Sequence, residues 1–323
     1  MERSALKAGA FIALLAFSWA APISGAALSH VLRQERTRSV STAAAGSKLS
    51  LPGAQAPARL RQVSGRGLVV NVWLNQSGPY AFAVDTGAGV TVVSAPAARG
   101  AGLVPNSRGS VEIGGLSNTF VSGQETVLGE LSIGEITNTV AIGHKALIVP
   151  TLPQGIDGIL DPTEAFAPLG YVIDIPGKEL RALDKGTKLR MGEEPPGGTV
   201  VRWIRQAHDG RPFVRLGDNR LALIDTGSGF ALAVIGTVAG ANGPNEPRKT
   251  SVHDLNGGSF TARKVGPTTV SVGSLVLRNV PTEVLSDTHF AAPVILGRGA
   301  LYPFRITFDP ASKLIEIAPV GAN

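Results

Sequence analysis

Two stretches of the sequence place an aspartate at the end of an apolar run and follow it with Thr, Gly, a small residue and a second Gly. They are AFAVDTGAGVTVVS, which contains Asp85, and LALIDTGSGFALAV, which contains Asp225. Burying a carboxylate is costly unless the group is paired or hydrogen-bonded. The glycines that follow can take positive φ and leave backbone N–H groups free to point at the carboxylate. An ordinary turn would account for one such motif, but it does not readily account for two copies with similar flanking residues.

A pair of carboxyl groups can carry acid-base chemistry when the two groups lie a few ångströms apart. Both cannot ionise cheaply at that separation, so the pair holds one proton and titrates as a unit. The ionised group can then act as a general base on bound water, while the protonated group donates to a carbonyl oxygen. This chemistry needs no metal ion and no covalent intermediate. The sequence has no cysteine, which rules out thiolate metal sites, cysteine nucleophiles and disulfides.

Buried strands that end in tight turns must position both motifs. Apolar side chains alternate over residues 68–74, and the run YAFAVD leads into the first motif, while VRL, the turn GDNR and LALID lead into the second. The chain of 323 residues has 43% hydrophobic residues, 40 Gly, 22 Pro and few aromatics, and most of its apolar runs are short and end at Gly or Pro. These features predict a folded, mainly β protein.

Further features recur in the same order after each motif. The first copy has Gly114-Gly115, LSIG, GILD and VIDIPGKEL, and the second has Gly257-Gly258, VSVG, VILG and TFDPASKLI. The shared order and similar spacing indicate an internal duplication. A Pro- and Gly-rich break, RMGEEPPGGT, separates the copies. We therefore expect two domains, at residues 63–190 and 199–323, joined by a linker at residues 191–198.

The motifs AVDTGAG and LIDTGSG, the Gly-Gly hairpins, the apolar-apolar-Gly unit and the final strands together resemble the aspartic peptidases. The short lobes are more similar to the bacterial retropepsin-like kind than to the pepsins, and the resemblance covers nearly all of residues 63–319. It implies an all-β fold of two retropepsin-like acid protease β-barrel lobes in one chain, with the active cleft between them. It also implies an aspartic endopeptidase that acts on a peptide or protein substrate and uses no cofactor and no metal. The alternative is a catalytically weak or inactive peptide-binding protein of the same fold.

The resemblance also assigns roles to particular residues. Asp85 and Asp225 form the catalytic dyad, which activates the water that hydrolyses a peptide bond. Thr86 and Thr226 cross-link the two active loops beneath the carboxylates. The remaining loop residues that support the site are Gly87, Ala88, Gly227 and Ser228. The hairpin tips that act as flaps over the substrate are Gly114, Gly115, Gly257 and Gly258. Because one chain holds both aspartates, we expect a monomer.

The two copies differ at the fourth position of the motif, which is Ala88 in the first and Ser228 in the second. A serine hydroxyl can donate a hydrogen bond to an ionised carboxylate and favour that form, whereas alanine cannot. We therefore expect Asp225 to ionise more readily than its partner, and the enzyme to work at higher pH than a dyad supported by two hydroxyls. The fifth position is glycine in both copies, at Gly89 and Gly229, where family members often carry a polar or acidic residue. This predicts looser loops.

Asp161 stands where the resemblance predicts a glycine, since the second copy has Ile295-Leu296-Gly297 at this point. The segment DPTE, residues 161–164, places Asp at the N-cap, Pro at N1 and Glu at N3 of a predicted helix. We favour this structural explanation. A functional third acid and a damaged first lobe remain as alternatives.

The N-terminus predicts export. Arg3 and Lys7 precede an apolar core, which is followed by Pro22 and several small residues. This is the layout of a signal peptide, here residues 1–27, and it predicts a periplasmic or secreted protein that contacts the membrane only if the segment stays uncleaved. Residues 28–62 are basic and rich in Ala, Ser and Pro, which indicates a linker or a propeptide that lays a cation across the dyad.

No other motif competes with the two aspartates. The net charge of +6 comes without a Lys/Arg run interleaved with aromatics, so no nucleic-acid partner is expected. Four histidines lack ligand-like spacing, and we expect them at surface or loop positions: His144, His208, His253 and His289.

Overall fold

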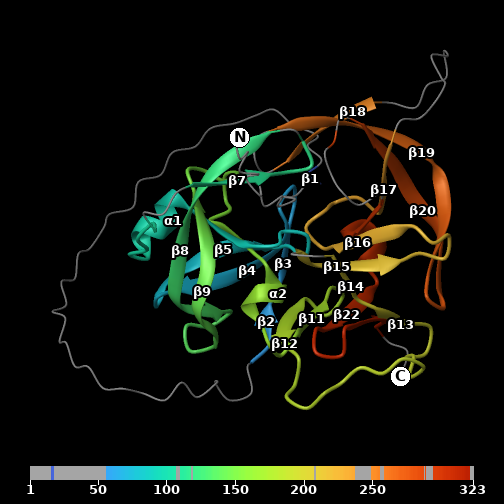
Figure 1. Cartoon of the computed structure of the whole chain (residues 1–323), viewed down its shortest axis with the longest axis horizontal. Helices are drawn as coiled ribbons and strands as arrows, with labels where there is room; N and C mark the ends of the chain where they lie inside the picture. Colours follow the sequence, from blue (N-terminus) through green and yellow to red (C-terminus); the bar gives the residue numbers. More distant parts are fainter. Residues whose placement is uncertain are drawn as a thin grey trace, which may run out of the picture.

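The computed structural model describes residues 16–17, 56–106, 110–117, 119–206, 209–236, 249–254, 258–286, 288 and 294–320. Within these ranges the strands form three sheets, and helix is confined to α1 (Ala95–Gly100), α2 (Pro162–Ala165) and α3 (Arg298–Leu301) (Figure 1). The predicted all-β class is confirmed. No helix in this part of the chain has the length and apolar character needed to cross a membrane. The predicted signal peptide lies outside the described residues, apart from residues 16–17.

An eight-stranded sheet surrounds the first motif. Its strand order is β3 (Arg61–Val63), β4 (Gly67–Leu74), β5 (Ser77–Val84), β10 (Gly158–Leu160), β6 (Thr91–Ser94), β9 (Thr139–Val149), β8 (Phe120–Ile133) and β7 (Ser110–Gly114). Strands β4 and β8 also pair with each other, so the sheet between them closes into a ring. The apolar side chains expected to alternate along β4 face the interior of this ring and are buried. The alternation read from the sequence is therefore confirmed.

A nine-stranded sheet surrounds the second motif. Its order is β1 (Ala16–Phe17), β18 (Lys249–Asp254), β19 (Ser259–Val272), β20 (Leu275–Ser286), β17 (Leu232–Ile235), β21 (Val294–Gly297), β16 (Leu221–Asp225), β15 (Asp209–Arg215) and β14 (Ile204–Gln206). The pairing repeats that of the first sheet. Strand β10 runs parallel to β5 and antiparallel to β6, and β21 runs parallel to β16 and antiparallel to β17. Each motif therefore follows a central strand with the same neighbours.

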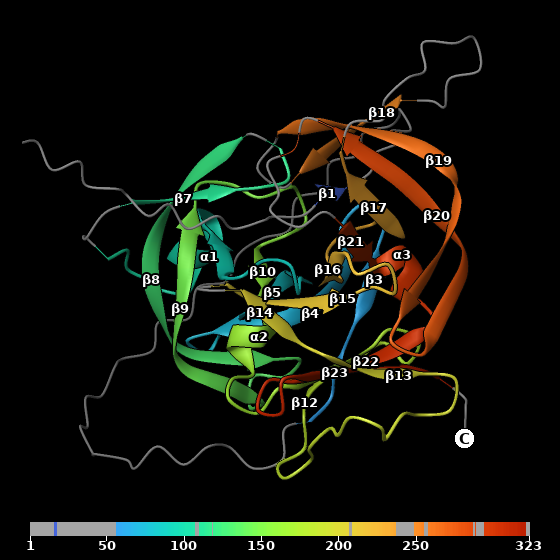
Figure 2. The same ribbon diagram turned by 45° about the vertical axis from the view of Figure 1, so that its right-hand side comes forward.

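A six-stranded sheet contains strands from both halves of the chain. Its order is β13 (Thr199–Arg202), β23 (Leu314–Pro319), β22 (Phe304–Asp309), β11 (Tyr171–Asp174), β12 (Glu179–Ala182) and β2 (Ala58–Arg59). Several of these strands lie together at the bottom of Figure 2. The pairing of β11 with β22 joins the halves, and Tyr171 stacks on Phe308 with 4.5 Å between ring centroids. This sheet fixes how the other two sheets sit relative to each other.

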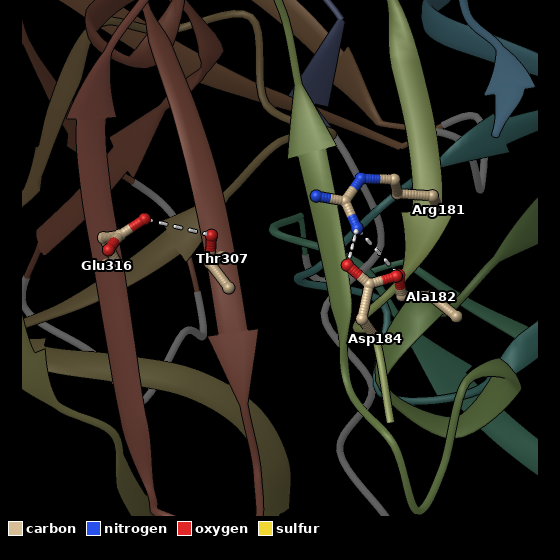
Figure 3. Close-up of polar contacts among 5 residues, drawn as sticks. All are labelled: Arg181, Ala182, Asp184, Thr307 and Glu316. Atoms are coloured by element: carbon tan, nitrogen blue, oxygen red, sulfur yellow. Dashed lines mark hydrogen bonds and ion pairs between the residues drawn. The ribbon is translucent and has the colours of Figure 1, made fainter. Parts of the chain in front are cut away.

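Side-chain hydrogen bonds and an exposed ion pair lie on the surface of the six-stranded sheet and contribute little to its stability. The Thr307 hydroxyl donates to Glu316 on the neighbouring strand at 3.3 Å, and Arg181 donates to Asp184 and to the carbonyl of Ala182, each at 3.3 Å (Figure 3). Exposed ion pairs of this kind contribute about 1 kcal/mol or less. The stability of the sheet therefore comes from its buried aromatic and aliphatic residues.

The folded chain begins earlier than the sequence predicted. Residues 58–62 were expected to belong to the linker, but β2 pairs with β12 and β3 pairs with β4. Ala58 and Leu60 are buried, whereas Arg59 and Arg61 are exposed. Only two residues of this segment, Ala58 and Leu60, point inward. The apolar alternation is therefore short, and the basic residues around it dominate the composition of the segment. Regular strand structure therefore begins at residue 58, within the range expected for the linker. Residues 183–198, which include the predicted linker at 191–198, contain no strand or helix.

A substitution at Gly158 tests how tightly the central strands pack. Gly158 pairs with Phe82 across the β10–β5 ladder, and a Cβ atom at this position would overlap the buried Phe82 ring. We expect Gly158→Ala to lower the free energy of unfolding by about 1–3 kcal/mol, because the ring has no space to move into. Urea unfolding followed by circular dichroism measures the change. Gly266→Ala is the matched control, because no atom lies within 4 Å of its Cβ position. Equal effects of the two substitutions would contradict this packing.

Candidate active site

The two motif aspartates lie at the ends of strands β5 and β16, which run through the central part of Figure 2. Asp85 directly follows β5, and Asp225 is the last residue of β16. The Asp85 N–H donates to the carbonyl of Leu160 at the end of the parallel strand β10, at 3.0 Å. Both aspartates are buried, with 0% and 6% of their surface exposed.

The structure brings the two carboxyl groups together. A Cβ atom at Gly87 would lie 2.9 Å from the Asp225 carboxyl carbon and 3.1 Å from each of its oxygens. The loop of the first motif therefore lies directly against the carboxyl group of the second, and only glycine fits at position 87. Asp85 Oδ2 is buried and receives no hydrogen bond from the N–H and O–H groups of the described residues. Asp85 and Asp225 also form a side-chain hydrogen bond with each other, which requires a proton on one of the two carboxyl groups.

Reciprocal hydrogen bonds between Thr86 and Thr226 hold the two loops together. The Thr226 N–H donates to Thr86 Oγ1 at 3.0 Å, and the Thr86 N–H donates to Thr226 Oγ1 at 3.3 Å. Each hydroxyl in turn donates to a carbonyl of the opposite strand, at Ile224 and Val84. Both threonines are fully buried. The cross-link expected between these residues is present, and it ties the end of β5 to the end of β16.

Backbone N–H groups bind the two carboxylates unequally. Asp85 Oδ1 accepts from the Gly87 N–H at 2.8 Å, whereas Asp225 Oδ1 accepts from the N–H groups of both Gly227 and Ser228, at 2.9 Å each. The Ala88 N–H donates to the backbone carbonyl of Asp85 instead, at 3.4 Å.

The asymmetry at the fourth position was expected to come from the Ser228 hydroxyl, and this mechanism is wrong. In the structure Ser228 Oγ accepts from the Phe230 N–H at 3.3 Å, and the Ser228 backbone N–H is the group that donates to Asp225.

The surroundings of the two carboxyl groups favour a proton on Asp85 over one on Asp225. Burial raises the pKa of Asp85 well above its ordinary 3.8, and the charge of Asp225 raises it further. Burial also raises the pKa of Asp225, but the Ser228 N–H, the hydrogen bond from Asp85, the Gly227 N–H and the charge of Arg298 all oppose this rise. Asp225 is therefore the partner that ionises first, in the direction expected from the sequence but for a different reason.

Arg298 is a site residue that sequence reasoning missed. Its Nη1 donates to the carbonyls of Thr226 and Gly227 at 3.0 and 3.3 Å, and its guanidinium packs over Gly67. Burial lowers its pKa, and the negative charges of Asp225 and Asp85 oppose that shift. The only signal in the sequence is its place directly after Ile295-Leu296-Gly297.

Arginine side chains also cover both fifth-position glycines. Arg298 Nη2 lies 3.7 Å from the Cβ position of Gly229, and the Arg211 side chain lies 3.7 Å from that of Gly89. Arg211 is buried and extends its cation over the Phe213 ring at 5.6 Å. These contacts pack against the loops at the positions where a missing acidic side chain was expected to loosen them.

Asp161 caps α2, which confirms the favoured interpretation. Its Oδ1 accepts from the Thr163 N–H at 2.9 Å, and Pro162 occupies the first helical position. The Asp161 N–H donates to Thr91 Oγ1 at 3.3 Å. Burial first, and the charge of Glu164 second, raise the pKa of Asp161 from 3.8 to about 7, and Asp161 in turn raises the pKa of Asp85.

The two expected flap hairpins meet at their tips. Gly114 ends β7, and the chain beyond it carries Leu116 into an apolar cluster with Phe230 and Phe260 of the second half. The Ser117 N–H and hydroxyl donate to Asp254 Oδ2 at 3.0 and 2.5 Å. The Gly258 N–H donates to the other oxygen of Asp254 at 3.0 Å, and Ser117 and Thr119 leave no room for a side chain at Gly258. Gly115 follows Gly114 at this tip, and Gly257 lies outside the described residues.

The expected surface or loop position of His144 is wrong. His144 is buried on β9, and its Nε2 lies 3.0 Å from Thr91 Oγ1. The residue alternates with exposed neighbours, but one inward position on a strand cannot be recognised from a single polar residue. The side chains of the other three histidines lie outside the described part of the chain.

Comparison with protein families places the first motif in a matched segment. Residues 70–160 match a family model of aspartyl proteases. The segment includes β5, the first motif and β10, and the second motif lies outside it. The match supports an aspartyl protease family and indicates a peptidase. None of the curated proteins matched the chain.

Removing one threonine hydroxyl should destabilise the whole site. Thr86→Val leaves the Thr226 N–H and the Ile224 carbonyl unpaired in a buried environment, so we expect the free energy of unfolding to fall by about 3 kcal/mol. Thr86→Ser keeps the hydroxyl and should cost about 1 kcal/mol. Thr226→Val should resemble Thr86→Val, and the double variant should lose less than the sum of both. Chemical denaturation measures all four variants, and additive losses would contradict a shared cross-link.

His144 should make the fold sensitive to acid. Burial lowers its pKa from 6.5 to about 4, so the folded state holds it neutral while the unfolded chain binds a proton below pH 6.5. Its contribution to stability is therefore complete above pH 6.5 and falls by up to about 3 kcal/mol as the pH approaches 4. His144→Gln cannot take up this proton but can still hydrogen-bond Thr91. Unfolding free energies of parent and variant, measured from pH 7 to pH 4, should diverge in favour of the variant. A difference that is independent of pH would contradict the assignment.

Proposed function

We propose that the protein is an aspartic endopeptidase that hydrolyses peptide bonds with water activated between Asp85 and Asp225. The observation that carries this proposal is the convergence of the two motif aspartates, which are buried and joined by a side-chain hydrogen bond. The threonine cross-link supports it, because it holds the carboxyl groups in place before any substrate binds. The family match to the segment around Asp85 adds independent support.

The uneven environment of the two carboxyl groups divides the chemistry between them. Asp225 is ionised and removes a proton from a water molecule bound between the carboxyl groups. Asp85 is protonated and donates its proton to the carbonyl oxygen of the scissile bond as the water oxygen attacks the carbonyl carbon. The product of this step is a tetrahedral diol, with the proton from water now on Asp225. That proton passes to the leaving nitrogen as the C–N bond breaks, and Asp85 regains a proton from the diol.

We further propose two retropepsin-like lobes, produced by duplication, with a cleft that binds an extended peptide. The matching order of strand pairing around the two motifs supports this arrangement. The hairpins that carry Gly114, Gly115, Gly257 and Gly258 would cover the peptide and supply main-chain hydrogen bonds. Entry of substrate then requires the bonds between Ser117 and Asp254 to open. We also propose export through residues 1–27 and action as a monomer.

Neutralising either aspartate should abolish cleavage. We expect Asp85→Asn and Asp225→Asn each to reduce kcat/KM for a cleaved peptide by about a thousandfold or more, because each variant lacks one half of the acid-base pair. A mixed peptide library analysed by mass spectrometry identifies substrates, and kcat/KM is then measured across a range of pH. Activity should fall in acid as Asp225 takes up a proton, and in alkali as Asp85 loses its own. Both limits should lie above those of ordinary aspartates, because burial raises both pKa values.

The exposed Asp184 provides a matched control, since Asp184→Asn removes the same charge far from the dyad. Cleavage that persists in both dyad variants would rule out the proposed mechanism. Binding of peptides without cleavage by the parent protein would favour a non-catalytic peptide-binding protein.

A further inference from the structure

The chain places a carboxyl group beside Asp85 at a position where the second half has no side chain. Leu160 pairs with Val84 in the parallel β10–β5 ladder, so Asp161 and Asp85 each lie one residue beyond that pair. In the second half the corresponding ladder pairs Asp225 with Gly297. Asp161 is therefore related to Asp85 as Gly297 is to Asp225. Residues opposite each other in a parallel ladder carry their side chains on the same face of the sheet.

Local backbone contacts explain why a side chain fits in one half only. The Gly297 N–H donates directly to the Ala231 carbonyl at 3.1 Å, and a Cβ atom at Gly297 would overlap the carbonyl of Phe230. The Asp161 N–H donates instead to the longer Thr91 side chain. This contact holds the backbone at Asp161 away from the facing strand and leaves space for its carboxyl group.

The residue at the fourth position of each motif also differs in size between the two halves. A Cβ atom at Gly297 would lie 3.1 Å from Ser228 Oγ, so the hydroxyl occupies the space that a side chain at position 297 would need. The first half has the opposite combination, with Ala88 in the motif and a carboxyl group after the parallel strand. The small residue and the larger one have exchanged places between the two halves.

We propose that Asp161 is a positioning residue for Asp85, whose negative charge favours the protonated form of Asp85 and so sets the alkaline limit of the dyad. This role rests on the proposed peptidase function. It is compatible with the capping role, because Oδ1 accepts from the Thr163 N–H whether or not the group is ionised at the other oxygen. Asp161 is 2% exposed, so its charge acts on Asp85 with little screening by solvent.

The groups that face Asp161 set the pH at which it acts. Burial and the charge of Glu164 on α2 raise the pKa of Asp161 to about 7, so its negative charge develops just as the solution becomes alkaline. The titratable or charged groups on the other elements around it are Asp85 after β5, His144 on β9, Tyr171 on β11, Arg205 on β14 and Arg211 on β15.

These neighbours do not offset the effect on Asp85. The interactions that shift the pKa of Asp161 and of Asp85 most include neither Arg205 nor Arg211. His144 and Asp161 both hydrogen-bond Thr91 Oγ1, and His144 is neutral above about pH 4. Tyr171 stays neutral, because burial raises its pKa well above its usual value, and its hydroxyl pairs with Thr163 Oγ1. Above pH 7 the ionised Asp161 therefore adds to the charge of Asp225 in holding the proton on Asp85.

Removing the charge of Asp161 should make Asp85 lose its proton at a lower pH. Asp161→Asn keeps a good N-cap residue and nearly the same volume but never becomes charged. We expect the alkaline limit of kcat/KM in this variant to move down by about one pH unit, which is close to a tenfold loss of activity on the alkaline side, with little change in the acidic limit. Glu164→Gln removes a charge that raises the pKa of Asp161, so it should lower that pKa. Because Asp161 itself stays in place, the alkaline limit of kcat/KM should remain close to that of the parent.

A measurement without substrate separates this inference from the proposed function. Carboxyl ¹³C NMR titration of the full chain, with Asp85→Asn and Asp161→Asn used for assignment, should show Asp161 titrating near pH 7 in the parent. It should also show Asp85 titrating about one pH unit lower in Asp161→Asn. A shifted Asp85 titration in a parent protein that cleaves no peptide would support the inference and contradict the function. Normal cleavage with an unchanged alkaline limit and an unchanged Asp85 titration in Asp161→Asn would overturn the inference and leave the function standing.

A second variant separates the effect of the charge from an effect of misfolding. Asp161→Ser also caps the helix without a charge and should reproduce the shift seen with Asp161→Asn. If Asp161→Ser and Asp161→Asn both fold, as judged by circular dichroism, but only one of them moves the alkaline limit, charge is not the cause and the inference is overturned.

Discussion

The mutual repulsion of two carboxylates held against each other in a buried space is the constraint on which the rest of the structure depends. Left free, Asp85 and Asp225 would move apart or attract water, and neither would keep an unusual proton affinity. The threonine cross-link prevents this locally, and Gly87 allows the first loop to rest on the Asp225 carboxyl group. At longer range, the pairing of β11 with β22 joins the halves that carry the two aspartates. Much of the buried core therefore serves to keep two groups close that would otherwise separate.

The two halves share a pattern of strands but give their aspartates different surroundings. Asp225 accepts two backbone hydrogen bonds and lies beside Arg298, whereas Asp85 accepts one and lies beside Asp161. Every one of these differences favours the ionised form of Asp225 or the protonated form of Asp85. A symmetric pair would leave the proton equally on either side. Here the sequence differences between the copies favour the ionised form of one carboxyl group and the protonated form of the other, as the proposed mechanism requires.

The features that could be predicted from the sequence are those encoded by local pattern. Strand alternation, the placement of the motifs after central strands and the cap at Asp161 all depend on neighbours within a few residues. Arg298 and Arg211 could not be predicted, because their roles arise when strands distant in sequence bring them beside Gly229 and Gly89. The role of Ser228 could not be predicted either, because the folded loop directs its backbone N–H to Asp225 and its hydroxyl to the Phe230 N–H. His144 was misjudged because burial of a lone polar residue depends on a partner, Thr91, on another strand.

The contact between the hairpin tips links access to the site with its electrostatics. The Asp254 carboxylate accepts two hydrogen bonds from Ser117 of the opposite hairpin and one from Gly258 of its own hairpin, and Leu116 is buried in the apolar cluster of the opposite half. Hydrogen bonds to a charged group are worth about 1.5–3 kcal/mol each, and burial of a leucine adds a similar amount. Separating the tips therefore costs several kcal/mol. Under the proposed function, an extended peptide would offset this cost by pairing with the hairpin strands, and the buried environment that raises both dyad pKa values would persist until such a peptide binds.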